Sequence, residues 1–102
     1  MQKQGWSVTA AVAGAIESLT RGLALDFAPI RVNAVCAGVI KTPLWSGMSV
    51  EDREAMYADT AQKLPVGRVG KPEDVAETYL HLMQSGFTTG QILVVDGGAV
   101  IS

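Results

Sequence analysis

The sequence predicts an α/β layer fold with three helices and two parallel strands. The strand segments, at about 30–36 and 91–95, are a β-branched stretch and a nearly unbroken apolar run. Continuous apolar strands are typical of parallel sheets covered on both faces. The connection between them is long enough for the right-handed crossover that parallel strands require. Helical patterns at about 7–27, 50–63 and 72–85 complete the layer.

The first helix is predicted from large apolar residues at helical spacing, which place one stripe along it: Val8, Val12, Ile16, Leu19, Leu23 and Phe27. A second stripe, about half a turn away, holds only small residues: Ala10, Gly14, Ser18 and Gly22. Two glycines inside a helix cost roughly 1 kcal/mol each relative to alanine. They are either tolerated at the surface or form a groove that lets another helix approach closely.

The other two helices are predicted from their starting residues. Ser49, with Asp52 three residues later, resembles a capping box that opens a helix with a thin apolar stripe. Pro72 suits the first turn of the third helix, and Glu73 and Asp74 suit its positive end. The broad apolar face of this helix consists of Val75, Ala76, Tyr79, Leu80, Leu82 and Met83.

Length and composition restrict the class of protein. The 102 residues hold one domain or part of one, and 48% apolar with 18% charged residues is a globular composition. A net charge of −2 without a lysine or arginine cluster argues against nucleic-acid binding. The single cysteine, Cys36, excludes an intrachain disulfide and a multi-cysteine metal site, so we expect no metal.

The apolar run at 10–16 is the one candidate for a targeting segment. A single charge, Lys3, precedes it, and Glu17 and Arg21 follow at once, so we expect no secretory signal. No apolar run approaches the ~18 residues of a membrane span. The sequence therefore predicts a soluble, cytoplasmic protein with no membrane partner.

Four blocks stand out along the chain, at residues 31–35, 38–43, 67–76 and 89–98. In their order and spacing, over essentially the whole chain, they resemble the C-terminal half of the short-chain dehydrogenase/reductase family. The resemblance implies a partial Rossmann-like layer fold in which residues 1–102 are a single C-terminal half-domain. The dinucleotide-binding half, with its Gly-x-x-x-Gly-x-Gly turn and the catalytic serine, is expected to be absent.

The family's Tyr-x-x-x-Lys pair, which acts as general acid/base, aligns with Gly5 and Thr9. Glycine has no proton to transfer, and threonine has no charge to lower the pKa of a phenol. We therefore expect no catalytic residue in this chain and no activity from the chain alone.

By the same resemblance, the cofactor is NAD or NADP, and part of its site is expected here. The backbone of Gly38, Val39 and Ile40 would face the nicotinamide carboxamide, and the hydroxyl of Thr42 would reach the carboxamide or the pyrophosphate. The chain has Ala37 where the family usually has proline, which loosens this loop. Binding of the cofactor by this chain alone is not expected.

Four single residues are interpreted from their positions. Asn33 in the first strand is expected to satisfy backbone groups, and His81 to be solvated. Cys36 is expected to be a small apolar strand residue. Trp45 either covers a substrate cleft or anchors its loop.

Three functional hypotheses follow. The chain is a truncated short-chain dehydrogenase/reductase, whose family performs NAD(P)-dependent oxidoreduction of a carbonyl or alcohol. Alternatively, it is a non-enzymatic oligomerisation module, or half of a split oxidoreductase completed by another chain. We expect a homo-oligomer, a dimer or tetramer, formed through the small-residue stripe of the first helix and the open sheet edge.

Overall fold

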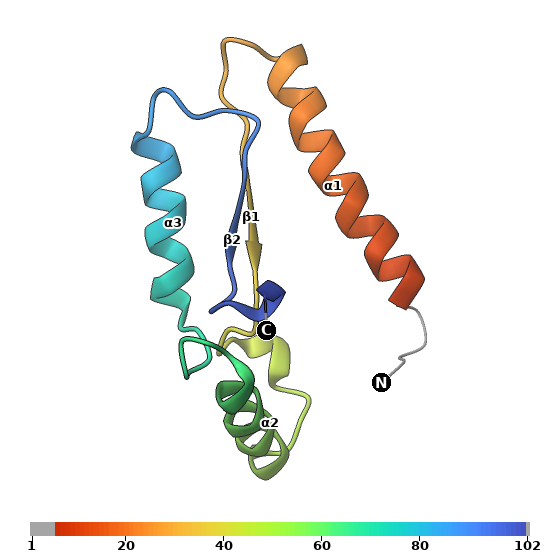
Figure 1. Ribbon diagram of the computed structural model, residues 1–102, viewed down its shortest axis with the longest axis vertical. Coiled ribbons are helices and arrows are strands. Elements are labelled where there is room, and N and C mark those ends of the chain that lie inside the picture. Colours follow the sequence, from red (N-terminus) through yellow and green to blue (C-terminus); the bar gives the residue numbers. More distant parts are fainter. Residues whose placement is uncertain (1–5, 102) are drawn as a thin grey trace. The chain divides into compact units, whose positions relative to one another are not determined.

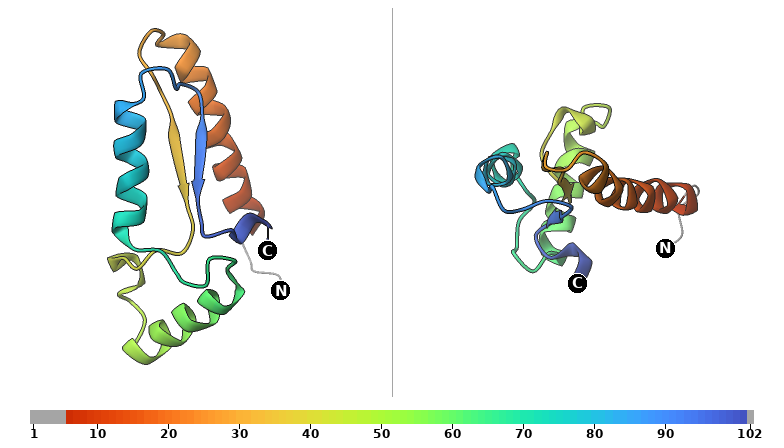
Figure 2. Two further views of the ribbon diagram at one scale, coloured as in Figure 1. Left: turned by 60° about the vertical axis from the view of Figure 1, so that its left-hand side comes forward. Right: turned by 90° about the horizontal axis from the view of Figure 1, so that it is seen from above.

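The computed structural model describes residues 6–101, with the side chains of 7–100, and the chain divides into two compact units. The first unit contains residues 1–34 and 85–93, and the second contains 35–84 and 94–102. The strands β1 (Ala34–Ala37) and β2 (Ile92–Val95) pair in parallel, and each begins in the first unit and ends in the second (Figure 2). The predicted fold class, with three α-helices and two parallel strands, is confirmed.

The helices begin and end within a residue of their predicted positions. They are α1 (Trp6–Asp26) in the first unit, and α2 (Val50–Lys63) and α3 (Pro72–Gln84) in the second (Figure 1). Two short 3-10 turns, η1 (Pro43–Trp45) and η2 (Ala99–Ile101), follow the strands. The Ser49 hydroxyl accepts a hydrogen bond from the Asp52 N–H at 3.1 Å, which confirms the predicted cap of α2.

The first strand starts four residues later than predicted, because side chains make part of the hydrogen bonds between the two segments before Ala34. The Asn33 amide donates to the Thr88 carbonyl at 3.0 Å and accepts from the Gln91 N–H at 3.0 Å. The Val32 N–H donates to the Thr89 hydroxyl at 3.1 Å. The expected role of Asn33 as a partner for backbone groups is thus confirmed. Backbone bonds lie on either side of it, from the Gly90 N–H to the Val32 carbonyl at 2.7 Å and from the Ala34 N–H to the Gln91 carbonyl at 2.9 Å.

Within the first unit, α1 is held near its C-terminal end. Thr20 and Ala24 are its buried residues, and a Cβ at Gly90 would lie 3.6 Å from the Ala24 Cβ. Most of the large apolar stripe is exposed, from 51% at Ile16 to 68% at Val8, whereas Leu23 is half-buried. This unit supplies only the short segments around the strand starts for packing, which is too little surface to cover a helix of 21 residues.

α1 meets the length and composition criterion for a membrane-spanning helix, which the search for uninterrupted apolar runs in the sequence did not predict. Ser7–Asp26 has a mean hydropathy of 1.2 and is long and apolar enough to cross a membrane, by length and composition only. Alanine, valine, leucine and isoleucine keep the mean high although glycine, serine and threonine interrupt the apolar run. A core helix of a soluble protein or a signal sequence meets the same criterion, so α1 is not assigned to a membrane on this ground.

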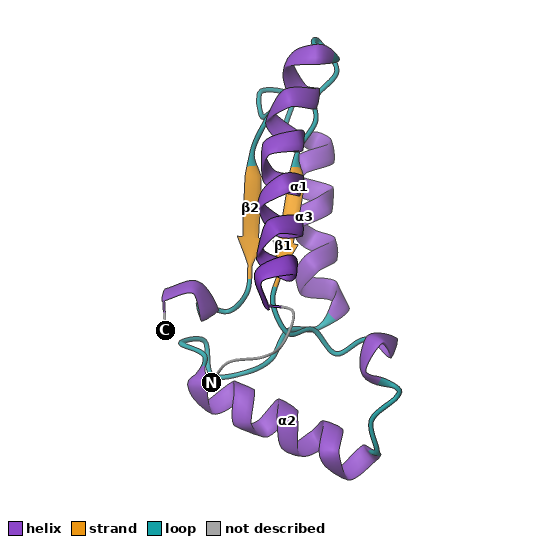
Figure 3. Ribbon diagram, turned by 90° about the vertical axis from the view of Figure 1, so that its right-hand side faces the viewer, coloured by secondary structure: helices purple, strands orange, loops and turns teal. Residues whose placement is uncertain are grey.

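The second unit has its own small core around the carboxyl ends of the strands. α2 lies beyond these ends, and α3 runs back alongside the strands (Figure 3). The buried side chains of this unit are Ile40, Tyr57, Leu64, Val69 and Leu82. The predicted apolar face of α3 is largely uncovered, with Tyr79, Leu80 and Met83 all more than half exposed. His81 is exposed as predicted, and Cys36 on β1 is exposed rather than covered.

Candidate functional site

The carboxyl ends of β1 and β2 border a cavity of about 220 Å³ in the second unit. Val39 and Ile40 line it after β1, and Val95, Asp96 and Gly97 line it at the end of β2. In open α/β sheets, ligands bind beyond the carboxyl ends of the strands. The sequence-predicted loop 38–42 therefore borders a position where this class of fold binds ligands.

The backbone of this loop is only partly used by the fold. The Gly38 N–H donates to the Val95 carbonyl at 2.9 Å, and the Lys41 N–H donates to the Gly70 carbonyl at 3.0 Å. The N–H groups of Val39 and Ile40 donate to no acceptor within residues 6–101. The loop thus offers two consecutive backbone donors at the rim of the cavity.

Gly38 itself is required by the packing of the strand ends. A Cβ at this position would lie 2.8 Å from the Cα and 2.9 Å from the Cβ of Asp96. Because the nearest atom belongs to backbone, the clash has no cheap relief. The glycine lets the loop pass against the end of β2, so its backbone is held at the cavity.

A tight turn after β2 forms the opposite rim. The Asp96 carboxylate accepts hydrogen bonds from the N–H groups of Gly98 at 2.9 Å and Val100 at 3.1 Å. Gly97 and Gly98 have φ values of 66° and 93°, a region that L residues with side chains rarely adopt. The Asp96 carboxylate therefore has a structural role in this turn.

The remaining predicted site residues hold the end of the loop. The Thr42 hydroxyl accepts from the Leu44 N–H at 3.3 Å and caps η1, and its own proton can be donated elsewhere. The Trp45 indole N–H donates to the Ile40 carbonyl at 2.9 Å. Of the two interpretations left open for Trp45, the structure supports the loop anchor.

A charged cluster that the sequence did not predict lies at the start of α3. The Arg68 guanidinium donates to both Asp74 carboxylate oxygens, at 2.8 and 3.0 Å, and the Lys71 N–H donates to the same carboxylate at 2.7 Å. The Arg68 hydrogen bonds, followed by the Lys71 N–H, hold the Asp74 pKa well below its usual range. The same pairing raises the pKa of Arg68. An arginine before Pro72 and an acid two residues after it were the available signal.

The two positions aligned with the family's acid/base pair are Gly5 and Thr9. Gly5 lies outside the described residues. Thr9 lies in α1, which belongs to the other unit. The site residues that the second unit does bring together are the backbone of residues 38–40 and the side chain of Thr42.

Comparison with known proteins identifies the family. A family model described as enoyl-(acyl carrier protein) reductase matches residues 2–100. The chain belongs to the short-chain dehydrogenase/reductase family. The short-chain dehydrogenase/reductase ATR9 of Stachybotrys chlorohalonatus is 45% identical over 98 residues, covering 96% of this chain and 38% of its own length. The resemblance predicted from the sequence blocks is therefore confirmed.

Solved structures agree with this assignment. A small-chain dehydrogenase in complex with NADPH is 47% identical, with a TM-score of 0.90 over 94% of this chain and 44% of its own. A short-chain oxidoreductase of Pseudomonas aeruginosa PAO1, with NADPH bound and an atypical catalytic centre, is 34% identical, with a TM-score of 0.74 over 92% of this chain and 39% of its own. The dehydrogenase/reductase chain described here thus spans about two fifths of the length of these relatives.

Proposed function

We propose that this chain is the C-terminal half of an NAD(P)-dependent oxidoreductase that acts on a carbonyl or alcohol, and that its loop 38–42 binds the nicotinamide end of the cofactor. The proposal is carried by the two backbone N–H groups of Val39 and Ile40 that the fold leaves available at the strand ends. A carboxamide has a carbonyl that accepts such bonds and an NH₂ that donates, so the donor set fits this group. The bound cofactor would donate or accept the hydride. Gly38, Val39, Ile40 and Thr42 would bind and orient its carboxamide end.

We further propose that these 102 residues perform no hydride transfer by themselves. No Gly-x-x-x-Gly-x-Gly turn occurs in the sequence, and this turn lets the backbone approach the pyrophosphate. The aligned acid/base positions are Gly5 and Thr9, and neither can supply the proton of a tyrosine. We expect the chain to bind NADPH or NADH more weakly than about 100 μM and to turn over no carbonyl substrate.

Reduced nicotinamide mononucleotide tests the loop directly, because it carries the nicotinamide end without the adenosine half. In an NMR titration of the ¹⁵N-labelled chain, it is expected to shift the amide signals of Val39, Ile40 and Thr42. Thr42→Val should weaken this effect by about three-fold through loss of one hydrogen bond, whereas Thr42→Ser should retain it. AMP is the control ligand. Equal shifts with AMP, or shifts confined to other residues, would contradict the proposed contact set.

A second candidate function is assembly, and the surface of α1 favours it. A Cβ at Gly14 or Gly22 would meet nothing within 4 Å, so the small-residue stripe lies open to a close-packed partner. We propose a soluble, cytoplasmic homo-oligomer, a dimer or tetramer, that buries Ala10, Gly14, Ser18 and Gly22. In the split-enzyme version of this proposal, a different chain supplies the nucleotide-binding half.

A further inference from the structure

A second cavity, of about 290 Å³, lies in the second unit between α2 and two loop segments. One wall is a single helical face of α2, formed by Glu54, Tyr57, Ala58 and Ala61. The other wall consists of Lys41, Arg68, Val69 and Lys71. Ile40 lines the cavity at the strand ends, whereas its neighbour Lys41 lines this one. Arg68 lines both cavities, so the two are neighbours that share this residue.

The charge of this second cavity is unusual for the chain. The Lys41 and Lys71 ammonium groups have no carboxylate within 4.0 Å in residues 6–101, and Arg68 is already paired with Asp74. Glu54 is the one acid in its lining. The local balance is thus one positive charge, in a protein whose net charge is −2. A singly charged anion would balance it.

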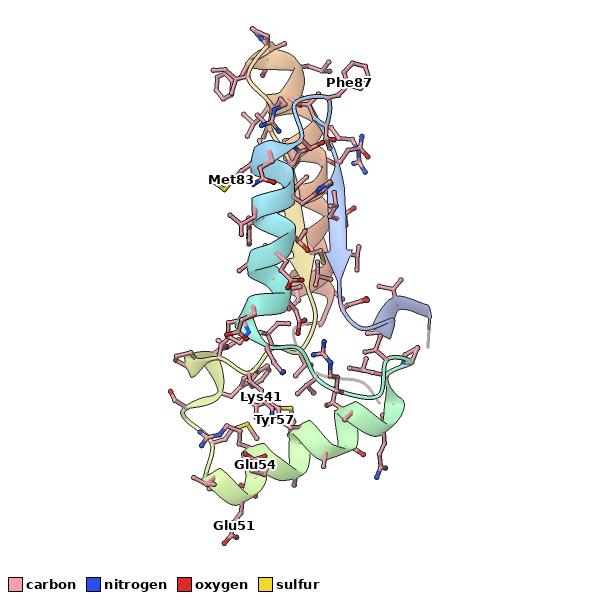
Figure 4. All side chains as sticks on the ribbon, turned by 90° about the vertical axis from the view of Figure 1, so that its left-hand side faces the viewer. Lys41, Glu51, Glu54, Tyr57, Met83 and Phe87 are labelled. Atoms are coloured by element: carbon pink, nitrogen blue, oxygen red, sulfur yellow. The ribbon has the colours of Figure 1, made fainter. Side chains whose placement is uncertain are left out.

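The floor of the cavity is apolar and holds a tyrosine ring. Tyr57 is 7% exposed, and the Lys41 ammonium lies 5.3 Å from the centroid of its ring. Figure 4 shows the two side chains together, with Glu54 one turn earlier on α2. Ala58 and Ala61 leave the open space, because their side chains end at Cβ. Lys41 is exposed, and its ammonium lies next to the tyrosine ring at the edge of this apolar recess.

We propose that this cavity binds a small organic carboxylate, with the carboxylate between Lys41 and Lys71 and its apolar body against Tyr57 and the two alanines. A volume near 300 Å³ is at the lower end of the range for ligand pockets, which suits a ligand of fragment size. The apolar floor distinguishes this ligand from a free inorganic anion. This proposal is independent of the proposed cofactor contact, because none of the residues given to the cofactor, Gly38, Val39, Ile40 and Thr42, lines this cavity.

Benzoate is the probe, and benzamide is its neutral control of equal shape. In an NMR titration of the ¹⁵N-labelled chain, benzoate is expected to give saturable shifts at Lys41, Tyr57 and Lys71, and benzamide to bind at least five-fold more weakly. Lys41→Gln and Lys71→Gln should each weaken benzoate binding by about three-fold, which is the usual size of one exposed charge pair. Added salt should weaken it further.

Filling the recess provides the geometric test. Ala58→Leu should abolish the benzoate shifts, because the larger side chain occupies the open space. Ala55→Leu, on the same helix outside the cavity lining, should leave them unchanged. Equal binding of benzamide, equal binding of inorganic phosphate, or full binding by Ala58→Leu would each overturn the proposal.

Discussion

Gly38 has two roles: it packs closely against the end of β2, and it belongs to the proposed cofactor-binding loop. Replacing it with alanine places a methyl group 2.8 Å from the Asp96 Cα, so the loop or the end of β2 must shift. We expect Gly38→Ala to lower the free energy of unfolding by about 1–3 kcal/mol, measured by urea denaturation. Gly47→Ala is the matched control, because a Cβ there meets nothing within 4 Å. Equal stability of the two variants would show that the strand ends are not as close as described.

The Arg68–Asp74 pair predicts how stability depends on pH. The pKa of Asp74 is lower in the folded chain than its ordinary value of 3.8. A lowered folded pKa gives a stabilisation that is present above the unfolded pKa and is lost as the pH falls below about 4 toward the folded value. We expect thermal unfolding at pH 3 to occur at lower temperature than at pH 7, with a smaller difference in Asp74→Asn.

Asp59→Asn is the control for this pH effect. Asp59 forms a single exposed bond to Lys63 on α2, at 2.9 Å, and exposed pairs of this kind contribute little. The unfolding temperature of Asp59→Asn should therefore depend on pH in the same way as that of the unmodified chain. If Asp74→Asn also matched it, the paired carboxylate would not be the source of the acid sensitivity.

Individual residues were predictable from the sequence where their role is local. Asn33 follows from the requirement that a polar side chain in a strand finds partners, and Ser49 from its position before a helix. Contacts between distant segments carry no such signal. Lys41 meets Tyr57 only because the fold brings the loop after β1 and α2 together.

At the scale of elements, the helix boundaries could be predicted from local capping residues and prolines, whereas the start of β1 could not be predicted from nearby residues. Pro72 and Ser49 act within a few residues of the helix ends, so the sequence contains the whole signal. The strand start depends on Thr88 and Gln91, which lie more than fifty residues away and form hydrogen bonds with the Asn33 side chain. Burial of the α1 and α3 faces was also not predictable, because it depends on what lies opposite them.

For the whole molecule, the exposed surface of α1 is the feature that any function must accommodate. Val8, Val12, Ile16 and Leu19 are all more than half exposed, on a helix that also carries an open small-residue stripe. Burying this surface would gain about 25 cal/mol per Å² of apolar area. Association of the chain is the expected result. We propose that the partner is either a second copy or a separate nucleotide-binding chain.

Sedimentation of the purified chain at micromolar concentration separates these partners. We expect a mass of two or four times 10.7 kDa, and a shift toward 10.7 kDa in Gly14→Leu, because a large side chain would hold the partner helix away. Ala15→Leu, about a quarter turn from the stripe, should retain the larger mass. A strictly monomeric chain would argue against self-association through the stripe. In that case we expect a separate nucleotide-binding chain to cover α1. Mixing the two chains should then give a complex of larger mass that binds NADPH.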